Sequence, residues 1–463
     1  MFNKAKKVIV VAGISLFLLI IFILQPQGLT VAGKRSLAVF VLCLSLWVSQ
    51  AIPLSVTALL GIGLMPLLNI MGLDHTFALF GNKAIFFILG ALILAAGLYQ
   101  TGLGSRIAFR IIGTFGSSPR LLLIGITVSA AFLSCIMPEH AVAALLFPII
   151  LEIVVSLDLK PLQSNYGKLL FLSMAWGAII GGITTYLGGA RNMLAVGLLE
   201  ENYNITIGFF EWITYSWPIP FLLLSIFILM IIFVFKIDIE DISGAHIKLE
   251  EKIKNAGKMD IKEKKLSIVT ILVILCWLFL SHKIHISITA IIGGVLTFIF
   301  GIVEWQEIEE YINWSVILMY GGAIVVASSL VETGVTTWLS EAIFSNLKLT
   351  PFVFLALLAF FTILLTEGVS NVAAVAIVLP LAYSIGDAYS INPVIITLSV
   401  ALPGGLAFML PMGTPPNAIA FSSGYYRIKD AVRWGFILNI IAWLIYIVVA
   451  RFYWPLIGLE ILS

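Results

Sequence analysis

The sequence has few charged residues. Only 11% of its 463 residues are Asp, Glu, Lys or Arg, whereas a soluble domain carries about a quarter. The formal net charge of +2 says little about partners. No basic patch interleaved with aromatic residues points to nucleic acid. The composition therefore argues against an ordinary soluble domain and gives no sign of a nucleic-acid-binding protein.

Cysteine is also scarce. The three cysteines, Cys43, Cys135 and Cys276, lie far apart and inside apolar runs. A Cys-x-x-Cys spacing is absent, so the sequence indicates neither a disulfide framework nor a zinc site. We interpret all three as packing residues.

Long apolar runs are what the sequence has in abundance. Hydrophobic residues make up 61% of the chain, and the mean hydropathy is +1.11. The runs are about 16–22 residues long, the length that crosses a bilayer core of about 30 Å. Outer-membrane barrels show weak alternation over about ten residues instead. The sequence therefore predicts an all-α, multi-pass membrane protein.

The first apolar run, residues 8–25, follows Lys4, Lys6 and Lys7. It is longer than the apolar region of a signal peptide, and a second span follows closely. We interpret it as the first membrane span. The lysines predict a cytoplasmic N-terminus, because basic residues are enriched on that side.

One long polar stretch, residues 235–266, divides the chain near its middle. It is rich in charges of both signs, which is typical of a solvated linker with some amphipathic helix. We expect three parts: a first repeat with the N-terminal span (1–234), a cytoplasmic linker (235–266) and a second repeat (267–463).

The two halves resemble one another. "ILGALILAAGLYQTGLGSRIA" (88–108) resembles "MYGGAIVVASSLVETGVTTWL" (319–339) at an offset of 232 residues, which places Gly90, Thr101 and Gly102 opposite Gly322, Thr333 and Gly334. At the same offset, "SCIMPEHAV" (134–142) lies over "TEGVSNVAA" (366–374). Paired broken segments in two halves are the best sequence indication of a secondary transporter's binding site.

A second pair of breaks follows the first in both halves. "GGITTYLGGARN" (181–192) corresponds to "PGGLAFMLPMGTPPN" (403–417), where prolines forbid a continuous helix. In hydrocarbon, backbone is left unpaired only where protein or a water-filled cavity receives it. Exposed carbonyls can bind Na⁺, and the amide end of a following half-helix attracts anions. These segments predict a joint cation and anion site.

These breaks resemble those of the divalent anion/sodium symporters, which carry dicarboxylates, citrate or sulfate. That family has a Ser-Asn-Thr triplet and a Gly-Thr-Pro-Pro-Asn-type loop in each repeat. Here "TEGVSNV" lacks only the final Thr, replaced by Val372, and "GTPPNAI" (413–419) is intact. The resemblance covers nearly the whole chain. It implies about 11 transmembrane helices and two re-entrant hairpins in two inverted repeats, arranged as a scaffold and an elevator-type transport domain, usually as a homodimer.

The resemblance also implies ligands for both substrates. The expected Na⁺ positions are Ser134, Gly188, Asn192, Thr366, Ser370, Asn371, Gly413 and Asn417. The expected positions around the anion are Glu139, His140, Gly189, Arg191, Ser370, Asn371, Val372, Thr414 and Pro415. Glu367, one turn before the triplet, is expected to brace the hairpin rather than to bind a ligand.

The first repeat departs from the family pattern. Its triplet position reads Pro138-Glu139-His140, and Arg191 stands in the loop where a proline is expected. Ionisable residues inside a membrane are functional by default. We expect Arg191 to take the place of the first Na⁺, joined to Glu139 by a bidentate bond. A purely structural ion pair is the alternative, as is an Arg191 that extends to the surface and leaves Glu139 to bind Na⁺.

The leading interpretation is secondary active transport of a small divalent anion, and three other functions compete with it. An arsenite or Na⁺/H⁺ antiporter would share the broken helices, an intramembrane enzyme would need a catalytic set that the sequence lacks, and a relative that has lost transport would explain the altered residues. We predict a plasma-membrane carrier whose partners are its anion, membrane lipid and a second copy of itself. Na⁺ is the expected coupling ion, with H⁺ coupling or anion exchange as replacements, and no organic cofactor is expected.

Overall fold

The computed structural model describes residues 4–24, 26–116, 118–281, 283–344 and 349–462. Within these ranges the regular structure is helical, apart from one isolated bridge between Ile391 and Leu462. The first half contains α1 (Lys4–Phe22), α2 (Val31–Ser49), α3 (Leu54–Leu67), α4 (Leu73–Phe80), α5 (Lys83–Gln100), α6 (Leu103–Thr114), α7 (Pro119–Leu133), α8 (Glu139–Ser156), α9 (Asn165–Gly182), α10 (Ala190–Tyr203), α11 (Phe209–Ser216) and α12 (Pro218–Phe233). The second half contains α13 (Ser243–Ala256), α14 (Ile261–Phe279), α15 (Ile286–Ile299), α16 (Trp305–Ile308), η1 (Glu309–Tyr311), α17 (Trp314–Glu332), α18 (Val335–Phe344), α19 (Pro351–Gly368), α20 (Asn371–Ala388), α21 (Pro393–Ala401), η2 (Pro403–Gly405), α22 (Pro415–Ser422), α23 (Ile428–Val448), the π-helical turn η3 (Val449–Tyr453) and α24 (Trp454–Leu456).

The all-helical, multi-span fold predicted from the sequence is confirmed. Seven helices of the described part are long and apolar enough to cross a membrane, or eight if the bent pair α11–α12 is one span. That pair bends by 45° where Pro218 begins α12. Shorter apolar helices such as α7 and α21 fall below the length criterion. They are short because each ends close to one of the predicted breaks.

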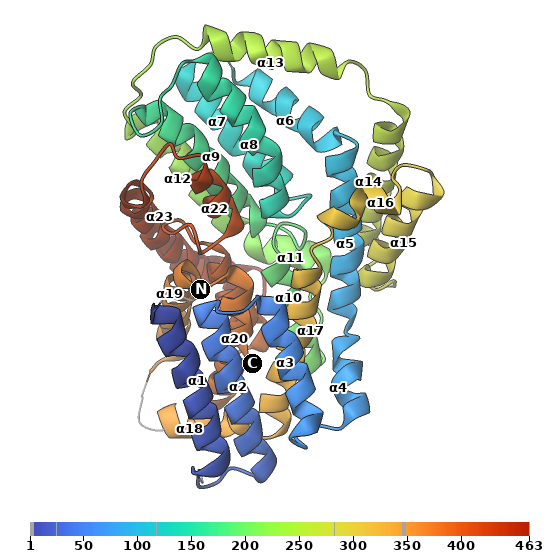
Figure 1. The fold of residues 1–463 in the computed structure, drawn as a ribbon, viewed down its shortest axis with the longest axis vertical. Coiled ribbons are helices and arrows are strands. Elements are labelled where there is room, and N and C mark those ends of the chain that lie inside the picture. Colours follow the sequence, from blue (N-terminus) through green and yellow to red (C-terminus); the bar gives the residue numbers. More distant parts are fainter. Residues whose placement is uncertain (1–3, 25, 117, 282, 345–348, 463) are drawn as a thin grey trace.

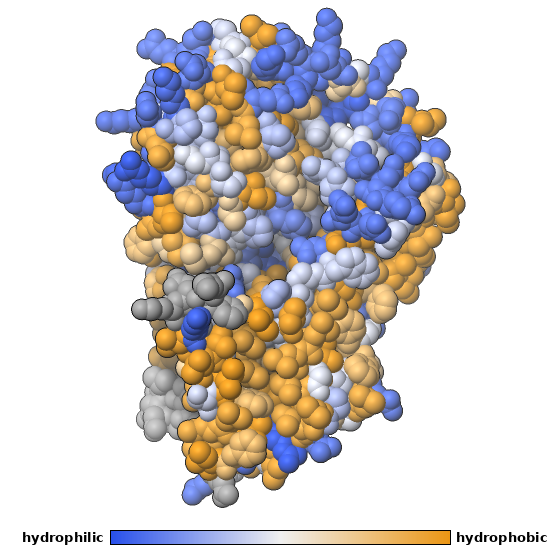
Figure 2. All heavy atoms as spheres, in the orientation of Figure 1, coloured by the Kyte–Doolittle hydropathy of each residue, from blue (hydrophilic) through white to orange (hydrophobic). Residues whose placement is uncertain are grey.

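Each half of the sequence contributes helices to both ends of the molecule. In Figure 1, α7, α8 and α9 occupy the upper half, whereas α20 lies in the lower half. The helix of the polar stretch, α13, crosses the upper end outside the bundle. Polar side chains gather over that end in Figure 2, and apolar side chains cover much of the lower half. α22 of the second half packs against α8 and α9, and α10 of the first half packs against α20, so the two halves interleave.

Equivalent positions have equivalent conformations in the two repeats. Gly102, after α5, has a φ of 77°, and Gly334, after α17, has a φ of 76°. Both glycines adopt the left-handed conformation that side chains disfavour. Pro148 lies inside α8 and Pro380 inside α20. The structure therefore supports the sequence register at points outside the breaks.

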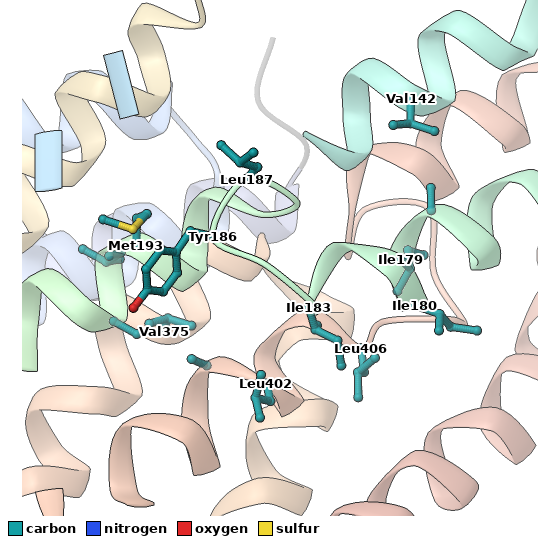
Figure 3. Packing of buried hydrophobic residues seen from close by; sticks show 14 of the residues in the cluster. Val142, Ile179, Ile180, Ile183, Tyr186, Leu187, Met193, Val375, Leu402 and Leu406 are labelled. Carbon is teal, nitrogen blue, oxygen red and sulfur yellow. The ribbon is translucent and has the colours of Figure 1, made fainter. Parts of the chain in front are cut away.

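Buried residues enclose the backbone of both breaks. In Figure 3, Ile183 of the segment 181–192 lies near Leu406 of the segment 403–417 and near Leu402 just before it, and Tyr186 and Leu187 lie further along the first segment. All five side chains are less than a tenth exposed. Polar backbone in such surroundings needs internal partners.

Buried tryptophans supply two of those partners. Trp212 Nε1 donates to the carbonyl of Ile183 at 3.1 Å, and Trp176 Nε1 donates to the carbonyl of Phe408 at 3.1 Å. Each tryptophan satisfies one carbonyl that a helix no longer uses. The breaks are thus held in place by side chains of the surrounding core.

Candidate site between the two hairpin tips

The tips of the two hairpins meet inside the molecule. The first lies between α7 and α8, and the second lies between α19 and α20. Glu139 opens α8 and Asn371 opens α20, so they occupy the same position in the two repeats. Asn371 Nδ2 donates to Glu139 Oε1 at 3.2 Å, across a separation of 232 residues. The offset read from the sequence is therefore also a direct contact.

Local sequence explains why both helices restart at these tips. Pro138 precedes α8 and has a φ of −58° and a ψ of 138°, which fits proline's fixed φ at the edge of a helix. Ser370 precedes α20, and its Oγ accepts from the backbone N–H of Ala373 at 3.2 Å. Serine is among the preferred residues at this capping position. The hydroxyl of Ser370 is thus engaged in a cap.

An asparagine braces the second break of each repeat. Asn192 Nδ2 donates to the carbonyls of Gly182 at 3.0 Å and Thr185 at 2.8 Å. Asn417 Nδ2 donates to the carbonyls of Ala407 at 2.9 Å and Leu410 at 3.3 Å. In both repeats the amide group joins the start of the new helix to the unwound chain before it.

Arg191 and Glu139 form a buried ion pair. Arg191 Nη1 lies 3.0 Å from Glu139 Oε1, and the side chains are 2% and 6% exposed. The sequence-based alternative in which Arg191 extends to the surface is therefore wrong. The expected bidentate geometry is wrong as well, because Glu139 Oε2 and Arg191 Nε and Nη2 have no hydrogen-bond partner among the described residues.

The second-repeat Na⁺ candidates are partly brought together. Thr366 Oγ1 donates to Asn371 Oδ1 at 2.7 Å and lies 3.0 Å from the carbonyl oxygen of Gly404. A side chain on Gly413 would meet the carbonyl of Thr366 at 2.9 Å, so the loop passes directly against the hairpin. Hydroxyl, amide and carbonyl oxygens are the ligands that hard cations prefer. Thr366, Asn371 and Gly413 therefore fit a Na⁺ site.

The first-repeat candidates have unused oxygens. Ser134 Oγ, Glu139 Oε2 and Asn192 Oδ1 are buried without a partner among the described residues. The carbonyl of Gly188 accepts from the backbone N–H of Glu139 at 2.9 Å. Asn192 Nδ2 already donates to two carbonyls, so its Oδ1 is the atom left without a partner.

The residues expected around the anion divide into a buried and an open group. Thr414 Oγ1 donates to Glu139 Oε1 at 3.0 Å, and Asn371 Nδ2 lies 3.4 Å from Thr414 Oγ1. Gly189 is buried beside Arg191. Val372 is half-buried and Pro415 is exposed. The buried group joins both tips and both loops.

His140 lies at the edge of this cluster, beside a cavity. The cavity has a volume of about 540 Å³ and lies between the first tip, α5 and the η1 turn. Pro138, His140, Tyr99 and Glu310 are among its lining residues. In Figure 2 the front face is hollowed between the upper and lower halves. His140 therefore connects the buried tip with an open space.

Glu367, at the end of α19, joins the second hairpin to the unwound loop after α21 and so has the hairpin-bracing contacts expected from the sequence. Its carboxylate accepts from the backbone N–H groups of Phe408 at 2.7 Å, Met409 at 2.9 Å and Leu410 at 2.8 Å. Asn439 Nδ2 of α23 donates to it at 2.7 Å. A fully used carboxylate of this kind fixes the loop and leaves little for a ligand.

Gly182 and Gly405 were not among the predicted site residues, yet both touch the ion pair. A side chain on Gly182 would collide with Glu139 Oε2, and one on Gly405 would collide with Arg191 Nε and Nη2. Their signal in the sequence is the matched pair of Gly-Gly dipeptides at 181–182 and 404–405. The dipeptides allow the two repeats to be aligned, but the sequence does not show that they contact the ion pair.

Known proteins resemble this chain over nearly its whole length. Residues 4–459 match the family model described as "Sodium:sulfate symporter transmembrane region". The sodium-dependent dicarboxylate transporter SdcS of Staphylococcus saprophyticus is 28% identical, over 99% of this chain and 94% of that protein. The protein of the same name from Staphylococcus aureus strain USA300 is 30% identical with the same coverage.

Two solved structures share the fold. The YdaH transporter of Alcanivorax borkumensis has a TM-score of 0.58 at 13% identity, covering 83% of this chain and 90% of that one. MtrF of Neisseria gonorrhoeae, described as illuminating a class of antimetabolite efflux pumps, has a TM-score of 0.51 at 14% identity, covering 81% and 83%. At such identities the likeness concerns the fold alone.

Proposed function

Because this chain belongs to the sodium:sulfate symporter family, a family of transporters and not of enzymes, we propose that it carries a small dicarboxylate across the membrane by secondary active transport coupled to Na⁺. The substrate class is supported by the relatives named as dicarboxylate transporters. The observation that carries the proposal is the meeting of Glu139, Asn371, Thr414 and Arg191 between two broken helices.

Na⁺ binds at the second-repeat break. Thr366 and Asn371 are joined by a hydrogen bond of 2.7 Å, and Gly413 packs against the carbonyl of Thr366. These groups are neutral, so a cation entering them meets no fixed positive charge from its own ligands. The site gives the carrier a cation whose gradient can drive uptake of an anion.

The anion binds between the two tips. The N-termini of α8 and α20 both open there, and each helix end contributes about half a positive charge. Two such ends are too little for a dianion, so further positive charge is needed. Asn371 Nδ2, Thr414 Oγ1 and the Arg191 guanidinium supply hydrogen-bond donors at the same place.

Arg191 takes the place of the Na⁺ that the family pattern would put at the first repeat. Its guanidinium is fixed by Glu139 at 3.0 Å and is buried. A fixed cation needs no gradient to bind, so the dependence of transport on Na⁺ is weaker than two Na⁺ sites would give. The carrier forms a homodimer in the plasma membrane, with its N-terminus and α13 on the cytoplasmic side.

Uptake of radiolabelled succinate and sulfate into proteoliposomes, with and without a Na⁺ gradient, tests this function. We expect succinate uptake that a Na⁺ gradient accelerates, that persists at a lower rate without Na⁺, and that Arg191→Ala abolishes. Steep Na⁺ dependence with a Hill coefficient well above one, unchanged by Arg191→Ala, would exclude the fixed-cation role. Transport of arsenite or Na⁺/H⁺ exchange without any succinate or sulfate uptake would replace the proposed function with an antiporter.

A further inference from the structure

A carboxylate of the chain itself occupies the centre of the site. Glu139 Oε1 receives hydrogen bonds from Arg191 Nη1 at 3.0 Å, Thr414 Oγ1 at 3.0 Å and Asn371 Nδ2 at 3.2 Å. These three donors come from both repeats and from both kinds of break. One oxygen atom thus gathers the donors that the proposed function assigns to the substrate.

We propose that Glu139 is a tethered carboxylate that holds the anion position when the carrier is empty and that a substrate carboxylate displaces it. The proposal rests on the proposed function, because it needs an anion site at these donors. It follows from the chemistry of the contacts: hydrogen bonds that satisfy one carboxylate satisfy another of the same charge and shape. Glu139 is the side chain placed to take them in the absence of substrate.

The ion pair lies in space that only glycines leave. Side chains on Gly182, Gly189 and Gly405 would each collide with Glu139 or Arg191. Gly182 and Gly189 belong to the first repeat, and Gly405 belongs to the second. Glycines from both repeats therefore make room for the ion pair. A chance contact between two charged side chains would not require such space from both repeats.

Mutual neutralisation has a consequence for the empty carrier. A buried charge without a partner is costly, whereas a hydrogen-bonded pair compensates both charges. With Glu139 in place, the guanidinium of Arg191 is paired even when no substrate is bound. The empty transport domain can then return across the membrane, and the protein can carry out net uptake as well as exchange.

The displaced carboxylate has a place to go. Pro138 and His140, its neighbours in sequence, line the cavity of about 540 Å³ beside the tip. Water in that cavity can hydrate a carboxylate that has left the donors, which limits the cost of displacement.

The test compares net uptake with exchange for one probe, labelled succinate. Proteoliposomes holding wild-type protein or Glu139→Gln are either empty or preloaded with unlabelled succinate. For Glu139→Gln we expect exchange to continue with a KM about tenfold lower, as when an internal competitor that fills the site nine-tenths of the time is removed. We expect its net uptake to be lost, because Arg191 is then unpaired in the empty carrier.

Two controls keep the result interpretable. Glu152→Gln, on the same helix but in an exposed pair with Lys252, should match the wild type in both modes. Glu139→Asp keeps the charge but is one methylene shorter, so its exchange KM should fall below that of the wild type, which can be measured even if Glu139→Gln does not fold.

An unchanged or higher exchange KM in folded Glu139→Gln, or net uptake equal to the wild type, overturns the inference. So does loss of both modes in a folded Glu139→Gln protein, since Glu139 would then be a required binding group. A wild-type KM in Glu139→Asp would also overturn it. Wild-type protein that moves no succinate in either mode would instead overturn the proposed function.

Discussion

The two hairpin tips differ in where their charged residues lie. The tip of the second repeat has neutral side chains and a carboxylate one turn earlier in the helix, whereas the tip of the first repeat itself contains the charged side chains. In the second repeat Asn371 opens the helix, and Glu367 lies behind it with its carboxylate satisfied by backbone N–H groups. In the first repeat Glu139 and Arg191 face one another at the tip. The position equivalent to Glu367 is Cys135, whose carbonyl accepts from a threonine instead.

The comparison shows that the two repeats share a backbone arrangement and differ in the side chains at their hairpin tips. Both use an asparagine, Asn192 or Asn417, to tie the unwound chain to the next helix. The scaffold of each break is therefore shared. The charges at the tips distinguish the two repeats, and the proposed function assigns a mobile cation to the second and a fixed one, Arg191, to the first.

Removal of the charged brace should have the largest effect. Glu367→Ala removes the acceptor of the N–H groups of Phe408, Met409 and Leu410, and each buried donor left unsatisfied costs about 1–3 kcal/mol. We expect no transport and a clear fall in the thermal unfolding temperature in detergent. Glu367→Gln keeps one acceptor oxygen, so its thermal unfolding temperature should fall less than that of Glu367→Ala. A melting temperature equal to that of the wild type in Glu367→Ala would mean that the loop does not depend on this brace.

The neutral tip should tolerate truncation structurally but not functionally. Asn371→Ala removes the contacts with Thr366 and Glu139. Hydrogen bonds to charged groups are worth about 1.5–3 kcal/mol, so we expect succinate uptake to fall at least about tenfold in a protein that still melts cooperatively. Uptake at the wild-type rate would refute the role of Asn371 in binding.

Much of this arrangement could be predicted from the sequence, because the offset between repeats aligns Glu139 with Asn371 and the shared Gly-Gly and Asn positions align the loops. The pairing of Arg191 with Glu139 also follows from that alignment. The hydrogen-bond geometry between Arg191 and Glu139, expected to be bidentate, could not be predicted from the sequence. Arg191 is confined by Gly189 and Gly405, so its position is set by packing rather than by the ideal geometry of a guanidinium and a carboxylate.

The convergence of three donors on one oxygen of Glu139 was likewise hidden. It depends on the position of Thr414, which lies on the other repeat, and on side-chain orientation, which pattern and spacing do not specify. Ser370 illustrates the same limit, since its hydroxyl caps α20. A motif names a residue, but local backbone geometry decides which of its atoms remain available.

Replacing the charged residues of the first repeat with the neutral residues of the second should create a Na⁺ site in the first repeat. Glu139→Asn with Arg191→Pro reproduces the neutral residues of the second repeat, where Pro416 holds the position equivalent to Arg191. Proline is tolerated in the first turn of a helix, and α10 begins at Ala190. We expect the Hill coefficient for Na⁺ to rise by up to about one, because it is bounded by the number of sites. An unchanged coefficient in a transporting double variant would show that Arg191 does not replace a Na⁺.

The smallest effect should come from the far end of the same first-repeat helix. Here the repeats differ again: α10 runs for 14 residues beyond its break, whereas α22 has 8. The longer helix carries Glu200 to Lys83 at the start of α5, with 2.5 Å between Nζ and Oε1. The lysine side chain is 61% exposed, and exposed pairs contribute only about 0.2–1 kcal/mol.

If α10 moves with the tips while α5 stays in place, this contact must open in each cycle. Lys83→Met should then raise the succinate uptake rate by at most about fivefold, and raising the salt concentration should narrow the difference from the wild type, because screening weakens surface pairs. A matched substitution of Lys248, whose partner Glu251 lies on its own helix, should leave the rate unchanged. Equal rates for wild-type and Lys83→Met proteins at low salt would show that the contact does not open during transport.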